Sequence, residues 1–575
     1  MNAFLKRATS LTLAVGFLLL IVLLRIGWLQ VVRGAAYREQ ASRQQAVSEK
    51  FEANRGEILA HEKDNLVPVA TIKEGWLMHI NPKLIQDPAK LYDDLSAIAS
   101  TTMPREEFIE RASKTNDPYE VIEHRVSPSS KRAIESAKLV GVEFSPERWR
   151  FYPAADFASH VIGFVGADGT GQYGLERFYN EDLFGRDGVF VGEKTSGGKL
   201  LWFGNATLTP AEHGASLVST LDTGVQSHLE GVLKNLQTHY SAQSAGGIII
   251  NPKTGRVIAM ASVPSFDPNA YSEVEDIAVF KNPLVEDLFE MGSVVKPLTI
   301  AAALDAGAIT PNTTYHDTGT RTIDGYTIAN FDLKARGVVP IQEILSQSLN
   351  LGTVFVMEQL GRDRFREYIH NFGLSEKTGI DVPGEATGKL NNLESTRLIE
   401  FATASFGQGI SMTGVEFVRA LSSIANGGVL VNPYLIEEVR DEQGSKIEKK
   451  RSESRRVLKE ETSKTVTRML VEVVDKKLAN GKGKIPGYSV AAKTGTAQIA
   501  SKNSRGYSGE FMHTFFGYGP AYDPQFLVFL YVERPQGIRY ASESLTEPFR
   551  AIMKHLFSYF EVIPDRPQEL EAKTP

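Results

Sequence analysis

Three short motifs, far apart in the chain, place the tightest constraint on its fold. They are Ser293-Val294-Val295-Lys296, Ser348-Leu349-Asn350 and Lys493-Thr494-Gly495, in that order. Each motif alone is too short to be informative. In this order they combine a serine nucleophile with lysines that can accept or carry a proton, which indicates acyl transfer through a serine. The fold must therefore bring three distant segments to one point.

The local sequence around Ser293 suits this chemistry. The residue opens the run 294–306, which we expect to be helical, so that its hydroxyl would face the positive end of a helix dipole and free backbone N–H groups. Lys296 follows three residues later, on the same helix face. A buried lysine near other cations loses its proton readily, and the neutral amine can then accept the hydroxyl proton.

Chance copies of each motif occur elsewhere, but none fits as well. The paired glycines of Ser196-Gly197-Gly198-Lys199 disfavour a helix. Lys253-Thr254-Gly255 lies in a predicted turn before the serine motif, whereas Lys493 lies in the strand-like stretch 488–498 after it. Ser501-Lys502-Asn503 comes too late in the order and lies in a polar stretch. We therefore expect one ordered set to form a site.

The N-terminus predicts one membrane anchor. Residues 8–24 are uncharged and mostly apolar, two positive residues precede them, and apolar residues resume after Arg25 as far as Val32. A span of about 20 apolar residues crosses a bilayer core, and preceding positive charge favours a cytoplasmic N-terminus. We expect a cytoplasmic tail at 1–7, an anchor at 8–32 and an exported remainder. A cleaved signal peptide is the alternative, which the positive residues near the cleavage region disfavour.

The chain of 575 residues is long enough for two or more domains. We expect a stalk and pedestal domain at 33–215, in which a polar helical stalk, from 33 to about 50, leads into mixed strands and turns without catalytic residues. A second domain at 216–565 contains all three motifs. A polar, frayed tail is expected at 566–575.

The second domain has predicted strands near both of its ends and predicted helices between them. Apolar runs joined by turn residues indicate hairpins, and amphipathic spacing indicates helices. This arrangement predicts an α+β fold, with helices packed on an antiparallel sheet. The expected strands are 247–250, 256–261, 488–498, 514–518 and 526–532, and the expected helices are 293–306 and 466–478.

Composition excludes several other functions. The chain has no cysteine, which rules out a disulfide framework, a thiol nucleophile and a cysteine metal site. A net charge of −6 gives no reason to expect nucleic acid as a partner. The charged stretch 437–464 contains basic clusters, but acidic residues interrupt them, and we expect a solvated hairpin or loop there.

On these motifs, the chain resembles the class B penicillin-binding proteins, which are monofunctional peptidoglycan D,D-transpeptidases. The resemblance extends to landmarks of the family's juxtamembrane, pedestal and transpeptidase segments. It implies a penicillin-binding transpeptidase domain preceded by a mixed α/β pedestal domain and one N-terminal transmembrane helix. The matching landmarks are Leu29-Gln30-Val31-Val32 with Arg33-Gly34, Arg55-Gly56-Glu57-Ile58, Arg150-Phe151-Tyr152-Pro153, His160, Gly174-Leu175-Glu176, Asp381-Val382-Pro383-Gly384-Glu385, Ser405-Phe406-Gly407-Gln408-Gly409 and Asn426-Gly427-Gly428.

The resemblance also implies roles for the first two motifs. Ser293 would be the nucleophile and Lys296 its general base. Ser348 would relay a proton to the leaving amine, while Asn350 would bind the donor peptide and hold Lys296. The implied reaction releases D-alanine from a stem pentapeptide, and an amine of a neighbouring stem then resolves the acyl-enzyme. A β-lactam would stall the first step, and no cofactor or metal is needed.

The third motif would bind the substrate. Lys493, Thr494 and Thr496 would bind the terminal carboxylate of the donor, and Gly495 would let the substrate strand lie close to the backbone. The backbone N–H groups of Ser293 and Thr496 would form the oxyanion hole.

The resemblance further implies a place and a partner. The protein would be a single-pass protein of the bacterial cytoplasmic membrane, with its catalytic domain outside. Its partner would be a lipid-II-polymerising glycosyltransferase of the shape–elongation–division–sporulation (SEDS) class, in a division or elongation complex. The modest pedestal slightly favours the division type, and the acceptor amine stays open.

Three alternatives use the same motifs. A class A β-lactamase needs a glutamate to activate water, and Glu385 is a candidate, although its Pro383-Gly384-Glu385 context resembles a structural turn. A D,D-carboxypeptidase would release its product to water, and a non-enzymatic sensor or scaffold would lack turnover. Two departures from the family pattern are Met291-Gly292, where Pro-Gly is common, and Asn480-Gly481-Lys482-Gly483, which could alter substrate contacts.

Overall fold

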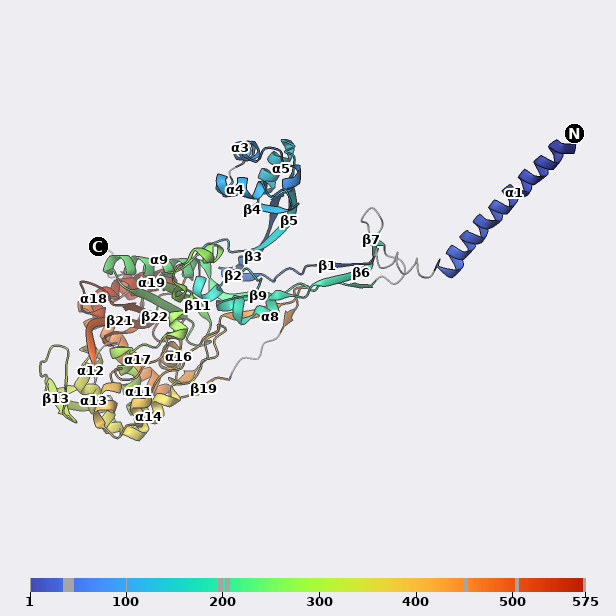
Figure 1. Ribbon diagram of the computed structural model, residues 1–575. Helices are drawn as coiled ribbons and strands as arrows, with labels where there is room; N and C mark the ends of the chain where they lie inside the picture. Colours follow the sequence, from blue (N-terminus) through green and yellow to red (C-terminus); the bar gives the residue numbers. More distant parts are fainter. Residues whose placement is uncertain are drawn as a thin grey trace. The chain divides into compact units, whose positions relative to one another are not determined.

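The computed structural model describes residues 2–34, 46–99, 101–194, 200–201, 207–447, 453–501 and 506–571. Contacts between residues group them into two compact units, whose elements are labelled in Figure 1. The smaller unit comprises Met1–Asn54 and Phe184–Gly214, and the larger comprises Arg55–Leu183 and Ala215–Pro575. The expected pedestal segment contributes to both units, and the domain boundary at 215 stays a prediction.

The smaller unit contains the apolar N-terminal helix. Helix α1 (Asn2–Gly27) continues into the π-helical turn η1 (Trp28–Val32). Among the described residues, Leu5–Val32 is the one stretch long and apolar enough to cross a membrane, and the predicted anchor lies within it. The guanidinium group of Arg25 lies 4.9 Å from the centre of the Trp28 ring, a pairing that suits a bilayer interface.

The expected helical stalk is wrong where the structure describes it. Strand β1 (Ala46–Phe51) pairs antiparallel with β6 (Gly188–Lys194), and β7 (Leu200–Leu201) and β8 (Thr207–Thr209) pair with β6 as well. Pairing with a partner far along the chain overrides the local helix propensity of this segment. The rest of the expected stalk, 35–45, lies outside the described residues.

In the larger unit, a seven-stranded sheet joins pedestal strands to later parts of the chain. Its order is β18-β17-β9-β2-β3-β4, and β5 also pairs with β3. The second half of β3 pairs with β4 and β5 and packs with three helices around a separate small core. The strands are β2 (Ile58–Glu62), β3 (Asn65–Ile80), β4 (Glu120–Val126), β5 (Val142–Phe151), β9 (Ser216–Asp222), β17 (Ile436–Arg440) and β18 (Lys446–Ile447), and the helices are α3 (Pro88–Ile98), α4 (Arg105–Ala112) and α5 (Pro128–Ser136).

A buried ionic cluster joins three of the pedestal landmarks. The side chain of Glu176 is fully buried, and its carboxylate accepts from Arg55 Nε at 2.7 Å and from Arg150 Nε at 2.6 Å. Tyr152 donates its hydroxyl to the same carboxylate at 3.2 Å, and Arg150 also donates to the Gly56 carbonyl at 2.7 Å. These landmarks therefore form one packed structural element.

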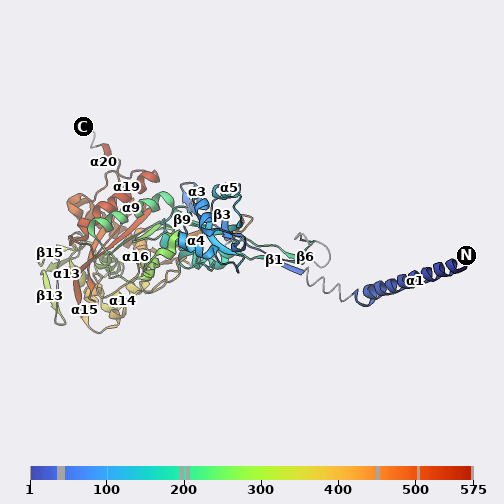
Figure 2. The same cartoon turned by 45° about the horizontal axis from the view of Figure 1, so that its top comes forward.

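A second, five-stranded antiparallel sheet, β11-β10-β22-β21-β20, lies between two layers of helices. Helices α9 and α19 lie side by side on one face (Figure 1 and Figure 2), and α11, α16 and α17 pack on the other. Ile249 faces the first layer while Ile248 and Ile250 face the second, which explains the uninterrupted apolar run. The predicted α+β fold is thus confirmed. The elements are β10 (Ser244–Ile250), β11 (Val257–Val263), β20 (Ala491–Ala500), β21 (Tyr507–Gly519), β22 (Phe526–Glu533), α9 (Thr223–Tyr240), α11 (Lys296–Asp305), α16 (Gly414–Ala425), α17 (Glu460–Glu472) and α19 (Thr546–Tyr559).

Most local predictions for this domain hold, with shifts at the ends of elements. Residues 251–255 form the turn between β10 and β11, as expected. The helix expected at 466–478 begins earlier, as α17, and ends in the π-helical turn η7 (Val473–Lys477). In the charged stretch, β17 and β18 form the expected hairpin, but the end of that stretch already belongs to α17.

The expected frayed tail is wrong for residues 566–571. Arg566 Nη1 lies 3.0 and 2.9 Å from the two carboxylate oxygens of Asp475, and the Arg566 backbone N–H donates to the Gly487 carbonyl at 3.0 Å. Polar composition did not reveal these long-range partners. Residues 572–575 lie outside the described chain.

Candidate active site

Ser293 lies on a tight turn in front of a helix. The 3-10 turn η5 (Gly292–Val295) contains it, and α11 begins at Lys296, so the helix starts later than predicted. Pro297 occupies the first turn of α11, where no intrahelical N–H donor is needed. The serine is partly exposed while the rest of the turn is buried, so the hydroxyl is accessible from a firmly packed backbone.

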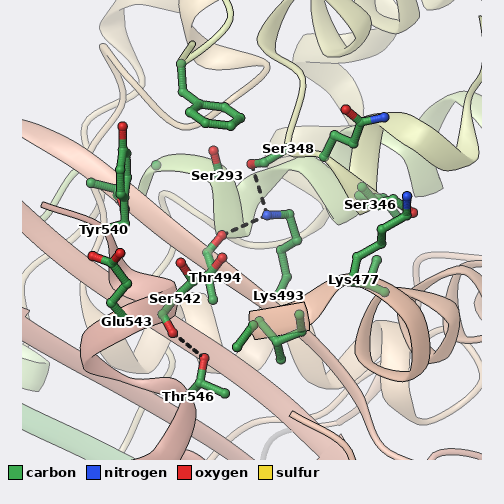
Figure 3. A pocket seen from close by; sticks show the side chains of 18 of the residues that line it. Ser293, Ser346, Ser348, Lys477, Lys493, Thr494, Tyr540, Ser542, Glu543 and Thr546 are labelled. Carbon is green, nitrogen blue, oxygen red and sulfur yellow. Dashed lines mark hydrogen bonds between the residues drawn. The ribbon is translucent and has the colours of Figure 1, made fainter. Parts of the chain in front are cut away.

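Two buried lysines flank the hydroxyl of Ser348. Lys296 Nζ lies 2.6 Å from the Ser348 carbonyl oxygen, 2.8 Å from Asn350 Oδ1 and 3.3 Å from Ser348 Oγ. Lys493 Nζ lies 3.0 Å from Ser348 Oγ and 2.9 Å from the Thr494 carbonyl oxygen, as Figure 3 shows. The three motifs therefore meet at one point. In this structure the Lys296 amine is hydrogen-bonded to the second motif rather than to Ser293.

Burial favours the neutral form of both lysines. Among the described residues, no carboxylate forms an ion pair with either of them. Burial, and then the charge of Lys493, lowers the pKa of Lys296 well below its ordinary 10.5, while burial lowers the pKa of Lys493 to about 7. A neutral Lys296 amine donates two N–H groups, to the Ser348 carbonyl and to Asn350, and keeps one lone pair that can accept a proton.

The backbone of Ser348 is held in an unusual conformation. Its φ of +55° lies in the left-handed region, which non-glycine residues rarely adopt. Helix α13 (Asn350–Leu360) begins two residues later, and Asn350 Nδ2 donates to the Ala329 carbonyl at 2.9 Å. Such strain persists where surrounding contacts fix the residue, as the two lysines do here.

Gly495 allows the strand β20 to approach the serine turn closely. A Cβ atom at this position would lie 2.4 Å from Thr514 Oγ1, 2.8 Å from the Met291 carbonyl oxygen and 3.1 Å from the Val294 nitrogen. These close contacts explain why position 495 is a glycine without reference to a substrate strand. Beside it, the Thr496 hydroxyl accepts from the Ala541 backbone N–H at 3.0 Å.

A pocket of about 880 Å³ opens over these groups. Six of the eight predicted site residues line it, whereas Lys296 and Gly495 lie behind its surface. The lining also contains residues that the sequence analysis did not assign to the site, because the three catalytic motifs do not include them. Phe331 and Tyr540 are edge-on at 6.0 Å between ring centroids, and charged side chains line other walls. The six predicted lining residues are Ser293, Ser348, Asn350, Lys493, Thr494 and Thr496.

The motif copies and the alternative glutamate do not join this site. Lys253-Thr254-Gly255 lies in the predicted turn between β10 and β11, away from the pocket lining. Glu385 accepts from the backbone and hydroxyl of Thr378, both at 2.6 Å, and from the Gly379 N–H at 3.1 Å, so it stabilises a turn. Positions 196–199 and 502–503 lie outside the described residues.

Known families match nearly the whole region that follows the anchor. Residues 245–554 match the penicillin-binding protein transpeptidase domain, and residues 50–219 match the penicillin-binding protein dimerisation domain.

Curated proteins match over most of their length. Stage V sporulation protein D of Bacillus subtilis is 33% identical, over 90% of this chain and 80% of its own. A probable peptidoglycan D,D-transpeptidase, PbpC of Pseudomonas aeruginosa, is 30% identical over 80% of this chain and 79% of its own. The peptidoglycan D,D-transpeptidase FtsI of Escherichia coli is 26% identical over 94% of this chain and 90% of its own. Among solved structures, penicillin-binding protein 2X of Streptococcus thermophilus has the same fold, with a TM-score of 0.73 at 21% identity over 92% of this chain and 82% of that one.

Proposed function

Because this chain belongs to the class B penicillin-binding proteins, we propose that it is a peptidoglycan D,D-transpeptidase that forms its acyl-enzyme on Ser293. Relatives of similar length bear the name of this activity. The observation that supports the assignment to Ser293 most strongly is the pair of buried lysines around Ser348, for which the described residues provide no carboxylate partner, beside the accessible serine. Serine acyl transfer needs such a base, because a free serine hydroxyl is a weak nucleophile.

In the first step, Ser293 Oγ attacks the carbonyl carbon of the penultimate D-alanine of a stem pentapeptide. The hydroxyl proton passes to the Lys296 amine as the new C–O bond forms. The C–N bond to the terminal D-alanine then breaks, and the Ser348 hydroxyl relays a proton to the departing amine. Lys296 and Lys493 both lie within hydrogen-bond distance of Ser348 Oγ, which supports a proton relay through it.

Lys493, Thr494 and Thr496 hold the terminal carboxylate of the donor. The Thr496 hydroxyl accepts from Ala541, so its own hydrogen stays available to a carboxylate oxygen. Backbone N–H groups of Ser293 and Thr496 stabilise the negative oxygen that develops on the attacked carbonyl.

In the second step, an amine of a neighbouring stem attacks the ester carbonyl. The C–N cross-link forms, the C–O bond to Ser293 breaks, and the serine recovers its proton. A β-lactam presents a cyclic amide to the same groups. Its leaving amine stays attached to the acyl group, so the enzyme remains blocked.

The N-terminal helix makes the chain a single-pass membrane protein. The two positive residues before the apolar run 8–24 favour a cytoplasmic N-terminus, with the domain at 216–565 outside the membrane. The chain has no cysteine, so single substitutions can report its orientation. A membrane-impermeant maleimide should label Tyr522→Cys in intact cells and should label Ala3→Cys only after lysis. The reverse pattern would refute this orientation.

A SEDS-class glycosyltransferase is the partner we propose, in contact with the anchor and with the segment 33–215. Such an enzyme supplies the uncross-linked glycan that a transpeptidase consumes. Co-purification from membranes should keep the two together, and a version that lacks residues 1–34 should lose the partner. Retention by the truncated version would place the contact outside the anchor.

Labelling with a fluorescent penicillin tests the central assignment. The full chain in detergent should gain the mass of one penicillin, and Ser293→Ala should gain none. An adduct on Ser293→Ala would refute the assignment, and an adduct that clears within minutes would favour a β-lactamase. With lipid II and a glycosyltransferase, cross-linked product is expected, whereas release of D-alanine without cross-links would indicate a carboxypeptidase.

A further inference from the structure

One wall of the active-site pocket carries two lysines that the proposed mechanism does not use. The turn η7 continues into the 3-10 turn η8 (Leu478–Gly481), and this segment lines the pocket with Lys477 and Lys482. In the view of Figure 3, Lys477 lies beside Ser346, on the opposite side of Lys493 from Glu543.

The other lysines of the same segment are paired. Lys476 forms an ion pair with Glu472 at 2.9 Å, and Lys484 forms one with Glu569 at 2.7 Å. Neither lines the pocket. Within the described residues, Lys477 and Lys482 have no carboxylate partner, so the two unpaired cations are the two that face the pocket.

The backbone between these two lysines is fixed. Ala479 and Asn480 have φ values of +49° and +57°, in the left-handed region that non-glycine residues rarely adopt. The side chain of Leu478 is buried, and a Cβ atom on Gly483 would lie 2.6 Å from Leu478 Cδ2. The packing of Leu478 and Gly483 therefore holds the turn, and the turn sets where both lysines project.

The pocket as a whole favours an anionic occupant. Its lining contains Lys493 and Arg539 as further cations and two carboxylates, of which Glu547 is already paired with Arg550 at 2.8 Å. Under the proposed function, Lys493 takes the terminal carboxylate of the donor. Lys477 and Lys482 then remain for a second anionic group on the substrate.

We propose that Lys477 and Lys482 bind a second carboxylate, on an interior residue of a stem peptide, and so select stems that carry it free rather than amidated. This inference rests on the proposed function, because the stem peptide is the occupant of the pocket. Stem peptides contain carboxylates besides the terminal one, on their γ-linked acidic residue or their diamino acid. A free carboxylate forms an ion pair with an ammonium group in addition to accepting its hydrogen bonds, whereas a neutral carboxamide oxygen only accepts a hydrogen bond.

Matched peptides test the proposal in the full chain. One pentapeptide ends in D-alanyl-D-alanine with its interior carboxylate free, and its twin has that group amidated. The release of D-alanine measures the rate of acylation by each donor peptide. A second pair of peptides, one with a free and one with an amidated carboxylate, serves as acceptors and is compared in the cross-linking step. We expect kcat/KM to favour the free form by roughly tenfold at low ionic strength, and less at high salt.

Two double variants carry the comparison. In Lys477→Met with Lys482→Met, kcat/KM for the free peptide should become nearly equal to kcat/KM for the amidated peptide. The control, Lys476→Met with Lys484→Met, removes the same charge from the same segment and should keep the preference for the free peptide. A preference in the donor pair places the second carboxylate on the donor, and one in the acceptor pair places it on the acceptor.

Equal rates for both forms in the wild type, or a preference that survives in Lys477→Met with Lys482→Met, would overturn the inference. Penicillin labelling of the same wild-type preparation separates this failure from failure of the proposed function. Labelled protein without a preference refutes the second carboxylate site alone. Absence of labelling on Ser293 would refute both.

Discussion

Two buried clusters of charge in this molecule are built in opposite ways. Around Glu176, two arginines share one fully buried carboxylate, and a tyrosine hydroxyl completes its hydrogen bonds. Around Ser348, the described partners of the two buried lysines are all neutral, namely carbonyl, amide and hydroxyl oxygens. The first cluster contains a counter-charge for its cations, and the second contains none among the described residues.

The difference separates structure from chemistry. A buried cluster that contains ion pairs joins distant segments, so its loss is expected to affect folding. An uncompensated cation shifts its pKa towards neutrality, so that it can exchange protons near physiological pH, and its loss is expected to affect reaction rate. Charge compensation, rather than burial, therefore indicates which cluster is the active site.

The substitution Lys296→Met should give the largest effect. It keeps an unbranched side chain and removes the amine, so we expect the second-order rate of acylation by penicillin to fall by roughly 10²- to 10⁴-fold. The free energy of unfolding should change by no more than about 2 kcal/mol, because neutral hydrogen bonds are lost. Stopped-flow labelling and urea unfolding measure the two quantities. Acylation of this variant near the wild-type rate would contradict the catalytic role of Lys296.

The substitution Glu176→Gln should have the opposite profile. It leaves Arg55 and Arg150 without a buried counter-charge, so we expect the free energy of unfolding to fall by about 3 to 5 kcal/mol. The folded fraction should still react with penicillin at the wild-type rate. Arg105→Gln is a suitable control, since its ion pair with Asp93 is exposed and contributes about 0 to 1 kcal/mol. A slower reaction without loss of stability would contradict the structural role.

The substitution Glu385→Gln should have the smallest effect. Its carboxylate already accepts three hydrogen bonds from Thr378 and Gly379, so we expect the lifetime of the penicillin adduct to be unchanged. Stability should fall by about 1 kcal/mol as the charged hydrogen bonds weaken. Intact-mass spectra over several hours measure the lifetime. A longer-lived adduct in the variant would give Glu385 the water-activating role of a β-lactamase.

The sequence predicted the centre of the site but not its walls. Ser293, Ser348 and Lys493 belong to motifs whose residue types already state their chemistry, and the structure brings them together. Lys477 and Tyr540 belong to no catalytic motif, so only the folded chain places them at the pocket. The conformation of Ser348 was equally invisible, because surrounding contacts rather than local sequence hold it.

The same distinction applies to the fold. Apolar runs such as 247–250 predicted the central sheet, because an uninterrupted apolar run indicates a strand buried on both faces, whichever strands pair with it. Strand β1 and the segment 566–571 were predicted wrongly, since the structure of both depends on distant partners that local sequence does not reveal. The glutamate and arginines of the pedestal were recognised as landmarks, but their shared ion pair became apparent only in the structure.

The pH dependence of acylation tests the central claim most directly. Lys493 must be charged to attract the carboxylate of penicillin, so the second-order rate should fall as pH rises above its pKa of about 7. Lys296 must be neutral to accept the proton, so the rate should rise with pH through its lowered pKa. We predict a bell-shaped profile whose falling limb moves to much higher pH in Lys493→Arg, because arginine keeps its charge. A rate that rises steadily to pH 10 in the wild type would contradict the account.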